Sequence, residues 1–373
     1  MIFQDKLNFL TLLSLINFLI KMLKNTLNFI ALCVAGCFHA QALAQTSLGT
    51  GADATGDPNN IAIGNVAIGT GYSAVAVGAA ATATGTDAIA VGLAAQATGG
   101  QSIAIGASTQ AAQLSTAFGW GSWADGERGT AVGHSTWANG FQSTAAGYSA
   151  YATGAYSTAV GSQSSASGSF STAIGQEANA SGGNSVSLGY QATASGAQAT
   201  AVGYGSIASA GNASAFGHLA NATEEFSTAL GTAAEAKAFN SVALGAFSVA
   251  DRPNTVSVGS VSQERQIVNV APATQGTDAV NLNQLQAVER KLTAGVATAL
   301  AMTPAQIAPG KSTAVGVGLG QFAGSSAVAL NVSHMLKENL HLNAGVSYSG
   351  SGARTTLGNN SQVGARVAMS FSF

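Results

Sequence analysis

The feature that most constrains this chain is a short repeat with a fixed period. The pattern Ser/Thr-Ala-apolar-Gly recurs from Gly64 to Gly259, with 14 residues between successive glycines except for 13 between Gly106 and Gly119. A second small residue often follows seven residues later. Repeats that contain a helix need about 20 residues or more, so each unit should hold two strands of about five residues and two tight turns. The repeat predicts one coil of a β-solenoid per unit.

Alternation along a strand assigns the side chains of each unit to two faces. In the unit that ends at Gly161, Thr158 and Val160 share one face and Ala159 points to the other. The aliphatic residue before each motif glycine should stack on its equivalents in neighbouring coils, about 4.8 Å away. A single coil cannot bury its apolar face alone, so stability must be a sum over neighbouring coils.

The charge distribution excludes a nucleic-acid partner. Only 8% of the 373 residues are charged, and residues 46–250 hold nine acidic and two basic side chains. Phosphate binding needs clustered Lys and Arg. The 47 glycines occur with only 5 prolines, which fits neither a collagen nor a proline-rich linker.

The N-terminal segment is typical of a secretory signal peptide. Lysines precede an apolar stretch, and a small-residue site at residues 42–44 predicts cleavage between Ala44 and Gln45. Met22 is an alternative start. A lipoprotein site with acylation at Cys37 is a second alternative. Both cysteines, Cys33 and Cys37, lie within this segment, so the mature chain would contain none.

A short helix is expected after the repeat ends. From Asn281 the apolar positions follow heptad spacing, with Glu289 as the polar seam position, at Leu282, Leu285, Leu292, Val296 and Ala299. At 1.5 Å per residue the segment from Asn281 to Ala301 reaches about 30 Å, which equals the hydrocarbon thickness of a bilayer.

The last 63 residues contain four alternating runs of about ten residues, the length of a tilted transmembrane β-strand. One face of each run is apolar and the other is small or polar. Four strands cannot close, and an open edge in lipid leaves costly unsatisfied backbone groups. Two copies would leave no room for helices inside, whereas three copies give twelve strands around three helices. A soluble four-stranded sheet is the alternative.

These features together resemble the YadA-like family of trimeric autotransporter adhesins. The resemblance rests on the signal peptide, the 14-residue repeats, the segment from Asn254 to Asn281 and a four-strand C-terminus ending in Phe373. It implies a left-handed parallel β-roll head, a short trimeric coiled coil and a 12-stranded outer-membrane β-barrel formed by three chains. The expected organisation is a signal peptide at 1–44, a head at 45–250, a neck at 251–280, a pore helix at 281–303 and anchor strands at 304–373.

The resemblance also implies the function and the partners. The chain is expected to be a surface adhesin whose anchor supports export of its own head to the cell surface. The expected partners are two further copies, outer-membrane lipid, the outer-membrane assembly machinery, and a protein of the host cell surface or extracellular matrix. The pore-facing anchor residues would be Ala327, Ala329 and Asn331. Family members commonly carry a glycine at the position of Asn331, so this chain departs from the family there, and the larger side chain would reduce the space for the pore helix.

Aromatic residues form the clearest candidate site. Trp123, Trp137 and Tyr151 are 14 residues apart, and Trp120, His134 and Tyr148 form a neighbouring set. Aromatic columns on the surface can bind proteins, since Trp and Tyr dominate interface hot spots. Ring stacking between coils and contacts between protomers are the alternative interpretations.

Two further patterns bear on the ligand. Collagen binding in the family is associated with an Asn-Ser-Val-Ala-Ile-Gly motif, which the segment with Asn240, Ser241, Val242, Gly245 and Ser248 resembles. Threonines that recur at the repeat period form a ladder, which suggests an ice- or surface-binding β-solenoid as the alternative function. Because Thr158 shares a face with Val160, the ladder should face inward or toward another subunit. No nucleophile, phosphate-loop or metal motif occurs, so neither an enzyme nor a cofactor is expected.

Overall fold

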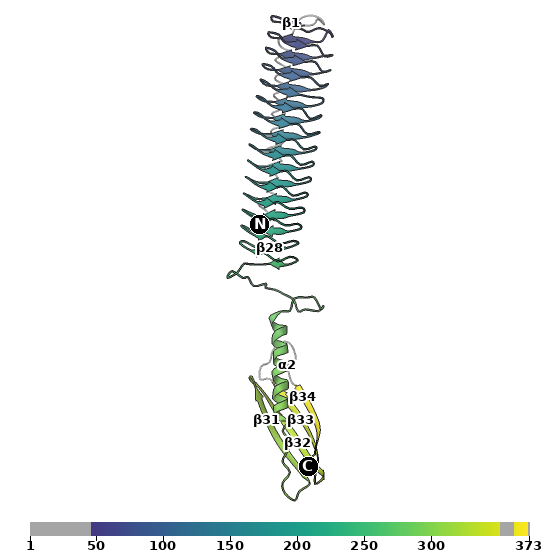
Figure 1. The fold of residues 1–373 in the computed structure, drawn as a ribbon, viewed down its shortest axis with the longest axis vertical. Coiled ribbons are helices and arrows are strands. Elements are labelled where there is room, and N and C mark those ends of the chain that lie inside the picture. The colour runs from purple at the N-terminus through teal and green to yellow at the C-terminus, as the bar shows by residue number, and fades with distance from the viewer. Residues whose placement is uncertain (1–45, 351–361, 372–373) are drawn as a thin grey trace. The chain divides into compact units, whose positions relative to one another are not determined.

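The computed structural model describes residues 46–350 and 362–371. They divide into two compact units, and the boundary along the chain falls between Arg265 and Gln266. The first unit is a stack of flattened coils, and every coil except those at the two ends has one strand in each of two parallel sheets (Figure 1). The predicted β-solenoid is confirmed. The signal-peptide cleavage site lies outside the described residues.

The 16-stranded sheet, named the aliphatic sheet, contains β1 (Thr46–Leu48), β2 (Ile61–Ile63), β4 (Val75–Val77), β6 (Ile89–Val91), β8 (Ile103–Ile105), β10 (Thr116–Phe118), β12 (Thr130–Val132), β14 (Thr144–Ala146), β16 (Thr158–Val160), β18 (Thr172–Ile174), β20 (Val186–Leu188), β22 (Thr200–Val202), β24 (Ser214–Phe216), β26 (Thr228–Leu230), β28 (Val242–Leu244) and β30 (Val256–Ser257).

The 14-stranded sheet, named the polar sheet, contains β3 (Ile68–Gly69), β5 (Thr82–Ala83), β7 (Gln96–Ala97), β9 (Gln110–Ala111), β11 (Trp123–Ala124), β13 (Trp137–Ala138), β15 (Tyr151–Ala152), β17 (Ser165–Ala166), β19 (Asn179–Ala180), β21 (Thr193–Ala194), β23 (Ile207–Ala208), β25 (Asn221–Ala222), β27 (Glu235–Ala236) and β29 (Val249–Ala250).

The strands are shorter than the five residues expected from the repeat. They contain two or three residues because a turn residue with positive φ recurs about every seven positions, as at Ser149 (φ 50°) and Tyr156 (φ 58°). A residue in this left-handed conformation ends the extended segment. Each coil therefore contains more turn than strand.

Nearly all side chains in the interior of the coils are small. Ala159 is fully buried between Thr158 and Val160, and the same pattern holds along both sheets. Many buried serines satisfy their hydroxyls within the turn, as when Ser157 Oγ donates to the carbonyl oxygen of Gly154 over 2.6 Å, whereas the buried hydroxyls of Ser143, Ser171 and Ser185 have no partner among the described residues. The core is thus a ladder of alanine and serine, and the threonine ladder faces out of the coil, not into it.

Close approach of the coils explains the motif glycines. Gly161 has φ +133°, and a Cβ atom there would lie 2.5 Å from the carbonyl oxygen of Gly175 in the next coil. An L side chain suits neither this conformation nor this distance. The glycine period is therefore set by the contact between successive coils.

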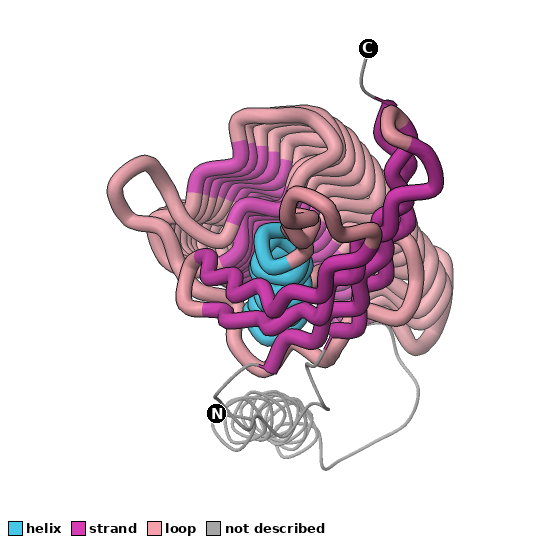
Figure 2. The backbone as a smooth tube through the Cα atoms, turned by 90° about the horizontal axis from the view of Figure 1, so that it is seen from below, coloured by secondary structure: helices cyan, strands magenta, loops and turns pink. Residues whose placement is uncertain are grey.

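The second unit consists of one helix and a four-stranded antiparallel sheet. The helix α2 spans Leu282–Ala301, and the sheet runs in the order β31 (Thr313–Phe322), β32 (Ser325–Lys337), β33 (Leu340–Gly350) and β34 (Gln362–Phe371). The N-cap Asn281 and Gln284 form a capping box, which satisfies free amides of the first turn. Figure 2 shows the sheet curving around the helix.

The two faces of the sheet and of α2 differ as expected. The small and polar side chains of β32 are buried beneath the helix while Val328, Leu330 and Val332 are exposed. On α2 the buried residues are small, namely Ala294, Ala297, Thr298 and Ala301. The heptad leucines lie on the exposed side of α2, free to contact other helices.

Candidate functional site

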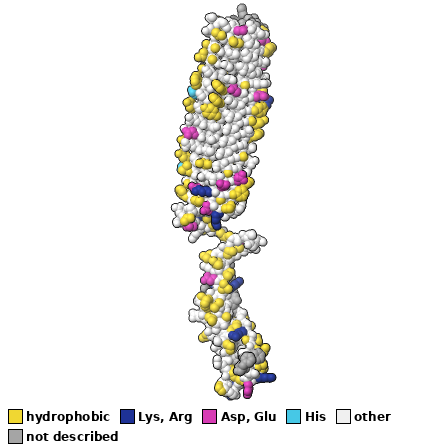
Figure 3. Space-filling view, in the orientation of Figure 1, with side chains coloured by type: hydrophobic (Ala, Val, Ile, Leu, Met, Phe, Trp, Pro, Cys, Tyr) yellow, Lys and Arg dark blue, Asp and Glu magenta, His cyan; other side chains and the backbone are white. Residues whose placement is uncertain are grey.

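The two outer faces of the solenoid differ in chemistry. The aliphatic sheet exposes columns of apolar side chains, and Leu188 on this face is 40% exposed. The outer face of the polar sheet carries mainly Thr, Gln, Ser and Asn. On the side visible in Figure 3, charged side chains are sparse along the repeat. Any sizeable aromatic group on the polar face is therefore conspicuous.

The predicted tryptophan column lies on the polar sheet. Trp123, Trp137 and Tyr151 occupy adjacent strands in register. The Trp123 and Trp137 rings are parallel within 4° and their centroids are 5.1 Å apart; Tyr151 meets Trp137 edge-on at 5.3 Å. Stacking between coils thus orders the rings, while Trp123 remains 38% exposed.

The second predicted column lies on the turn that follows each motif glycine. His134 is sandwiched between Trp120, with ring centroids 4.6 Å apart, and Tyr148, at 5.1 Å. Trp120 is 56% exposed. A further stack on this turn contains Tyr190, Tyr204 and His218.

The opposite turn carries aromatic residues that the 14-residue spacing does not align. Tyr156 stacks on Phe170 with centroids 4.8 Å apart and meets Phe141 edge-on at 5.3 Å. Both Tyr156 and Phe170 adopt positive φ, a conformation that is unfavourable for bulky residues. The sequence pattern does not reveal this contact, because Phe141 and Tyr156 are 15 residues apart rather than 14.

These residues occupy consecutive coils and span both turns as well as the intervening strand. We name the set the aromatic belt: Trp120, Trp123, His134, Trp137, Phe141, Tyr148, Tyr151, Tyr156 and Phe170. A protein surface that exposes so many rings together, next to a mainly polar sheet, has the composition of a binding surface.

A carboxyl group with altered acidity lies beside the belt. Asp125 follows Trp123 by two residues and shares its face of the polar sheet. Burial raises the pKa of Asp125, and a hydrogen bond from the Gln110 side chain partly opposes this effect. Asp125 is exposed and only partly desolvated, so beside Trp123 it gives the belt a polar contact as well as an apolar one.

Most residues of the collagen-type motif pack within the last coils of the head. Ser241 and Ser248 are buried, and their hydroxyls donate to the carbonyl oxygens of Ala238 and Leu244. Val242 belongs to β28 of the aliphatic sheet, and Gly245 lies against Arg265. Asn240 is exposed in a turn, where its amide donates to Asn254 over 2.8 Å.

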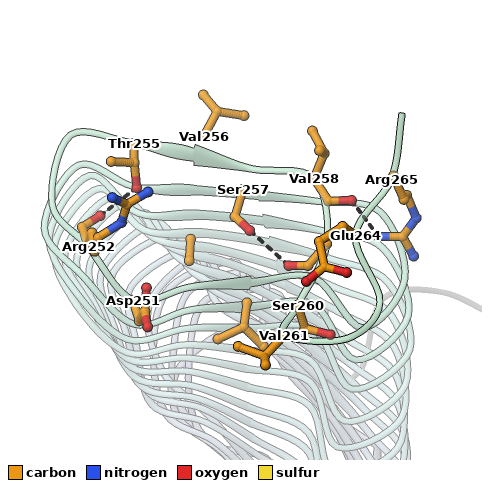
Figure 4. A pocket seen from close by; sticks show the side chains of 13 residues that line it. Asp251, Arg252, Thr255, Val256, Ser257, Val258, Ser260, Val261, Glu264 and Arg265 are labelled. Carbon is orange, nitrogen blue, oxygen red and sulfur yellow. Dashed lines mark hydrogen bonds between the residues drawn. The ribbon is translucent and has the colours of Figure 1, made fainter. Parts of the chain in front are cut away.

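The end of the first unit forms a groove of about 380 Å³ beneath the last coil (Figure 4). Arg265 closes one side of it: its guanidinium donates to Ser248 Oγ over 2.8 Å, to the carbonyl oxygen of Val258 over 2.7 Å and to that of Ala246. The arginine thereby ties the segment after the repeat to the final coil.

The anchor residues named from the sequence are brought together beneath α2. Ala327, Ala329 and Asn331 alternate along β32, and all three side chains are buried against the helix. The amide of Asn331 donates to the carbonyl oxygen of Ala301 at the end of α2.

Within residues 46–350 and 362–371, no group of three or more His, Cys, Asp or Glu side chains could hold a metal ion. Among the helices that the structure describes, none is long and apolar enough to span a membrane.

Comparisons with known proteins cover nearly all of the described chain. Repeats of the YadA head domain match nine segments between residues 70 and 262, some of which overlap. The coiled stalk of trimeric autotransporter adhesins matches 266–302, and the YadA-like membrane anchor domain matches 305–373. The crystal structure of the collagen-binding domain of Yersinia adhesin YadA is 29% identical and aligns over 55% of this chain and 84% of its own, with a TM-score of 0.25. The chain therefore belongs to the YadA-like family of trimeric autotransporter adhesins, homotrimers that are anchored in the outer membrane and display the head on the cell surface.

Proposed function

We propose that the head attaches to its ligand through the aromatic belt, and that the three heads of a trimer pack together through the outer faces of their aliphatic sheets. The observation that carries this proposal is the placement of the Trp123 column on the sheet opposite the apolar columns. A trimer that buries one sheet from each head leaves the other sheet free for attachment.

The aliphatic sheet has the properties of a subunit interface. Its apolar residues form continuous columns, as in the pairing of Phe216 with Leu230 and of Leu230 with Leu244. A contiguous apolar surface of this length marks an interaction site on a soluble domain. The threonine ladder shares this face, so its burial in the trimer would prevent it from contacting ice or any other surface. The polar sheet is therefore the better attachment face.

The chemistry of the belt favours a protein ligand. Trp and Tyr are enriched in interface hot spots because they bury a large apolar area at a low cost in conformational entropy. Since the ring faces in the Trp123 column are used for stacking between coils, a ligand would contact the exposed ring edges together with Asp125. The excess of acidic residues on the head suits a partner with basic patches. A protein of the host cell surface or extracellular matrix meets these requirements.

Collagen is a specific candidate because of the motif around Asn240. Its contact there would have to use the exposed Asn240 side chain, since Ser241 and Ser248 are buried. Binding through the motif and binding through the belt are separable, because they involve different coils.

We further propose that the exposed side chains of β31, such as Val315, Val317 and Leu319, contact outer-membrane lipid. Insertion of twelve strands would require the outer-membrane assembly machinery. The proposed limits are a signal peptide at 1–44 cleaved between Ala44 and Gln45, a head at 45–250, a neck at 251–280, a pore helix at 281–303 and an anchor at 304–373.

Attachment of bacteria that display the full-length trimer tests the belt. Replacement of both Trp123 and Trp137 with Ser should reduce adhesion to immobilised collagen or to a host-cell monolayer at least about tenfold, the effect of losing one hot spot. Tyr190→Ser with Tyr204→Ser, a stack on other coils, is the matched control and should adhere like the parent. Full adhesion by the tryptophan variant, at equal surface display, would rule out the belt.

A further inference from the structure

Two side chains from the anchor sheet meet the C-terminal end of α2. The last carbonyl groups of a helix lack partners within it and carry partial negative charge, and α2 has no basic residue in its last turn. Asn331 of β32 donates from Nδ2 to the carbonyl oxygen of Ala301 over 3.2 Å. Arg366 of β34 donates from Nη1 to that of Met302 over 2.9 Å. The carbonyl oxygen of Ala301 also accepts from the backbone amide of Thr303 over 2.9 Å, and the two strands add side-chain donors to this helix end.

Both donors belong to one row across the whole sheet. Gly316 pairs with Asn331, Asn331 with Gly345, and Gly345 with Arg366. We name these four residues the polar rung. Its long polar side chains alternate with glycines, so each reaches the helix without crowding by its neighbour.

The glycines of the sheet provide the clearance that Asn331 needs. A Cβ atom at Gly345 would overlap Asn331 Oδ1, and one at Gly318 would overlap the carbonyl oxygen of Ala301. Asn331 is only 4% exposed while α2 covers it, so a small shift of the helix end along the sheet would leave its amide buried without an acceptor. Leaving such a donor unsatisfied is costly.

We propose that the polar rung is a clamp that holds the C-terminal end of α2 at a fixed level in the pore once the head has been exported, and so keeps the pore closed. The two acceptors are carbonyl groups at the end of the helix, so the clamp forms only when α2 is in place. Asn331 and Arg366 act here as positioning residues for the helix that fills the barrel.

Ion conductance of the purified full-length trimer in planar lipid bilayers tests this clamp. Asn331→Ala combined with Arg366→Met should increase the open fraction of the pore about tenfold or more, as expected for the loss of net hydrogen bonds at each helix end. Asn343→Ala is the matched control, because this pore-side amide contacts Ser333 and Ser370 of neighbouring strands instead of the helix. It should conduct like the parent.

A disulfide provides a second readout. The hydroxyls of Thr293 on α2 and Ser325 on β32 lie 3.0 Å apart, so Thr293→Cys with Ser325→Cys should tie the helix to the sheet independently of the rung. Added to the clamp variant, the oxidised pair should suppress the openings and reduction should restore them. The proposal would be overturned if the clamp variant conducted like the parent, or if Asn343→Ala opened as often as the clamp variant. Failure of the clamp variant to assemble as a trimer would also overturn it, because the clamp acts after assembly.

Discussion

Trp123 and Trp137 lie on adjacent coils with their rings stacked in parallel, 5.1 Å between centroids. The ring faces are therefore used between coils, and the edges point toward solvent. Each tryptophan contributes to the stability of the neighbouring coil as well as to the proposed binding surface, so the two effects must be measured separately.

Trp137→Ser should lower the stability of the head without preventing trimer formation. Trp137 contacts an aromatic ring on both sides, and loss of both pairs together with the buried ring area should cost about 2–3 kcal/mol. Gln96 occupies the equivalent position on β7, and the control variant Gln96→Ser should change the free energy of unfolding by less than about 0.5 kcal/mol. Thermal unfolding of the full-length trimer measures both; equal melting temperatures would show that the stack adds no stability.

Substitution of a motif glycine should be far more damaging than substitution of a turn glycine. A Cβ atom at Gly161 would meet the Gly175 carbonyl oxygen at 2.5 Å in a left-handed backbone, whereas at Gly183 its nearest neighbour would be 4.0 Å away. Gly161→Ala should cost about 2–3 kcal/mol or more, and Gly183→Ala should be nearly neutral. Surface display and melting temperature report the difference, and a stable Gly161→Ala head would show that coils can separate at little cost.

The regular part of the fold could be derived from the sequence because a solenoid repeats local contacts. The spacing of the motif glycines placed Trp123, Trp137 and Tyr151 in one column, and the structure confirms their register. The faces of β32 were equally predictable, since alternation alone assigns Ala329 and Leu330 to opposite sides.

What depends on three-dimensional detail could not be derived. Alternation separated Ala159 from Thr158 and Val160 but did not say which face is inside. The interior of the coils holds Ala, Ser and Thr almost throughout, with Asn60 in an early coil as a larger buried side chain. Tyr156 and Phe141 occupy neighbouring turn positions, so their contact breaks the 14-residue spacing. The bonds from Asn331 and Arg366 to the helix end depend on how far α2 reaches along the sheet, which no periodicity encodes.

The stability of the head should depend on pH through Asp125. Burial raises the pKa of Asp125 in the folded head, so the folded state binds the proton more tightly than the unfolded chain. The resulting penalty is present above the folded pKa and vanishes as the pH falls below the unfolded value of about 3.9. Asp125→Asn should therefore raise the melting temperature at pH 7 more than at pH 3.5. The same difference at both pH values would contradict this assignment.

Arg265→Ala should open the last coil of the head. The guanidinium joins Ser248, Val258 and Ala246, and the nearby amide of Val249 donates to the carbonyl oxygen of Gly259 over 2.9 Å. Hydrogen exchange at Val249 should accelerate about tenfold or more, while the amide of Val186 should stay protected. Arg252→Ala removes the same charge nearby and serves as control; equal protection of Val249 in all three proteins would show that Arg265 does not close the coil.

Attachment through the belt requires that the polar sheet of the head is free in the trimer. Residues 46–373 contain no cysteine, so single cysteines at Thr153, on the polar sheet beside the belt, and at Val160, on the aliphatic sheet, can be labelled on intact cells with an impermeant maleimide. Burial of the aliphatic sheet predicts rapid labelling at position 153 and protection at position 160. Protection at 153 together with labelling at 160 would place the belt inside the trimer and contradict its role in attachment.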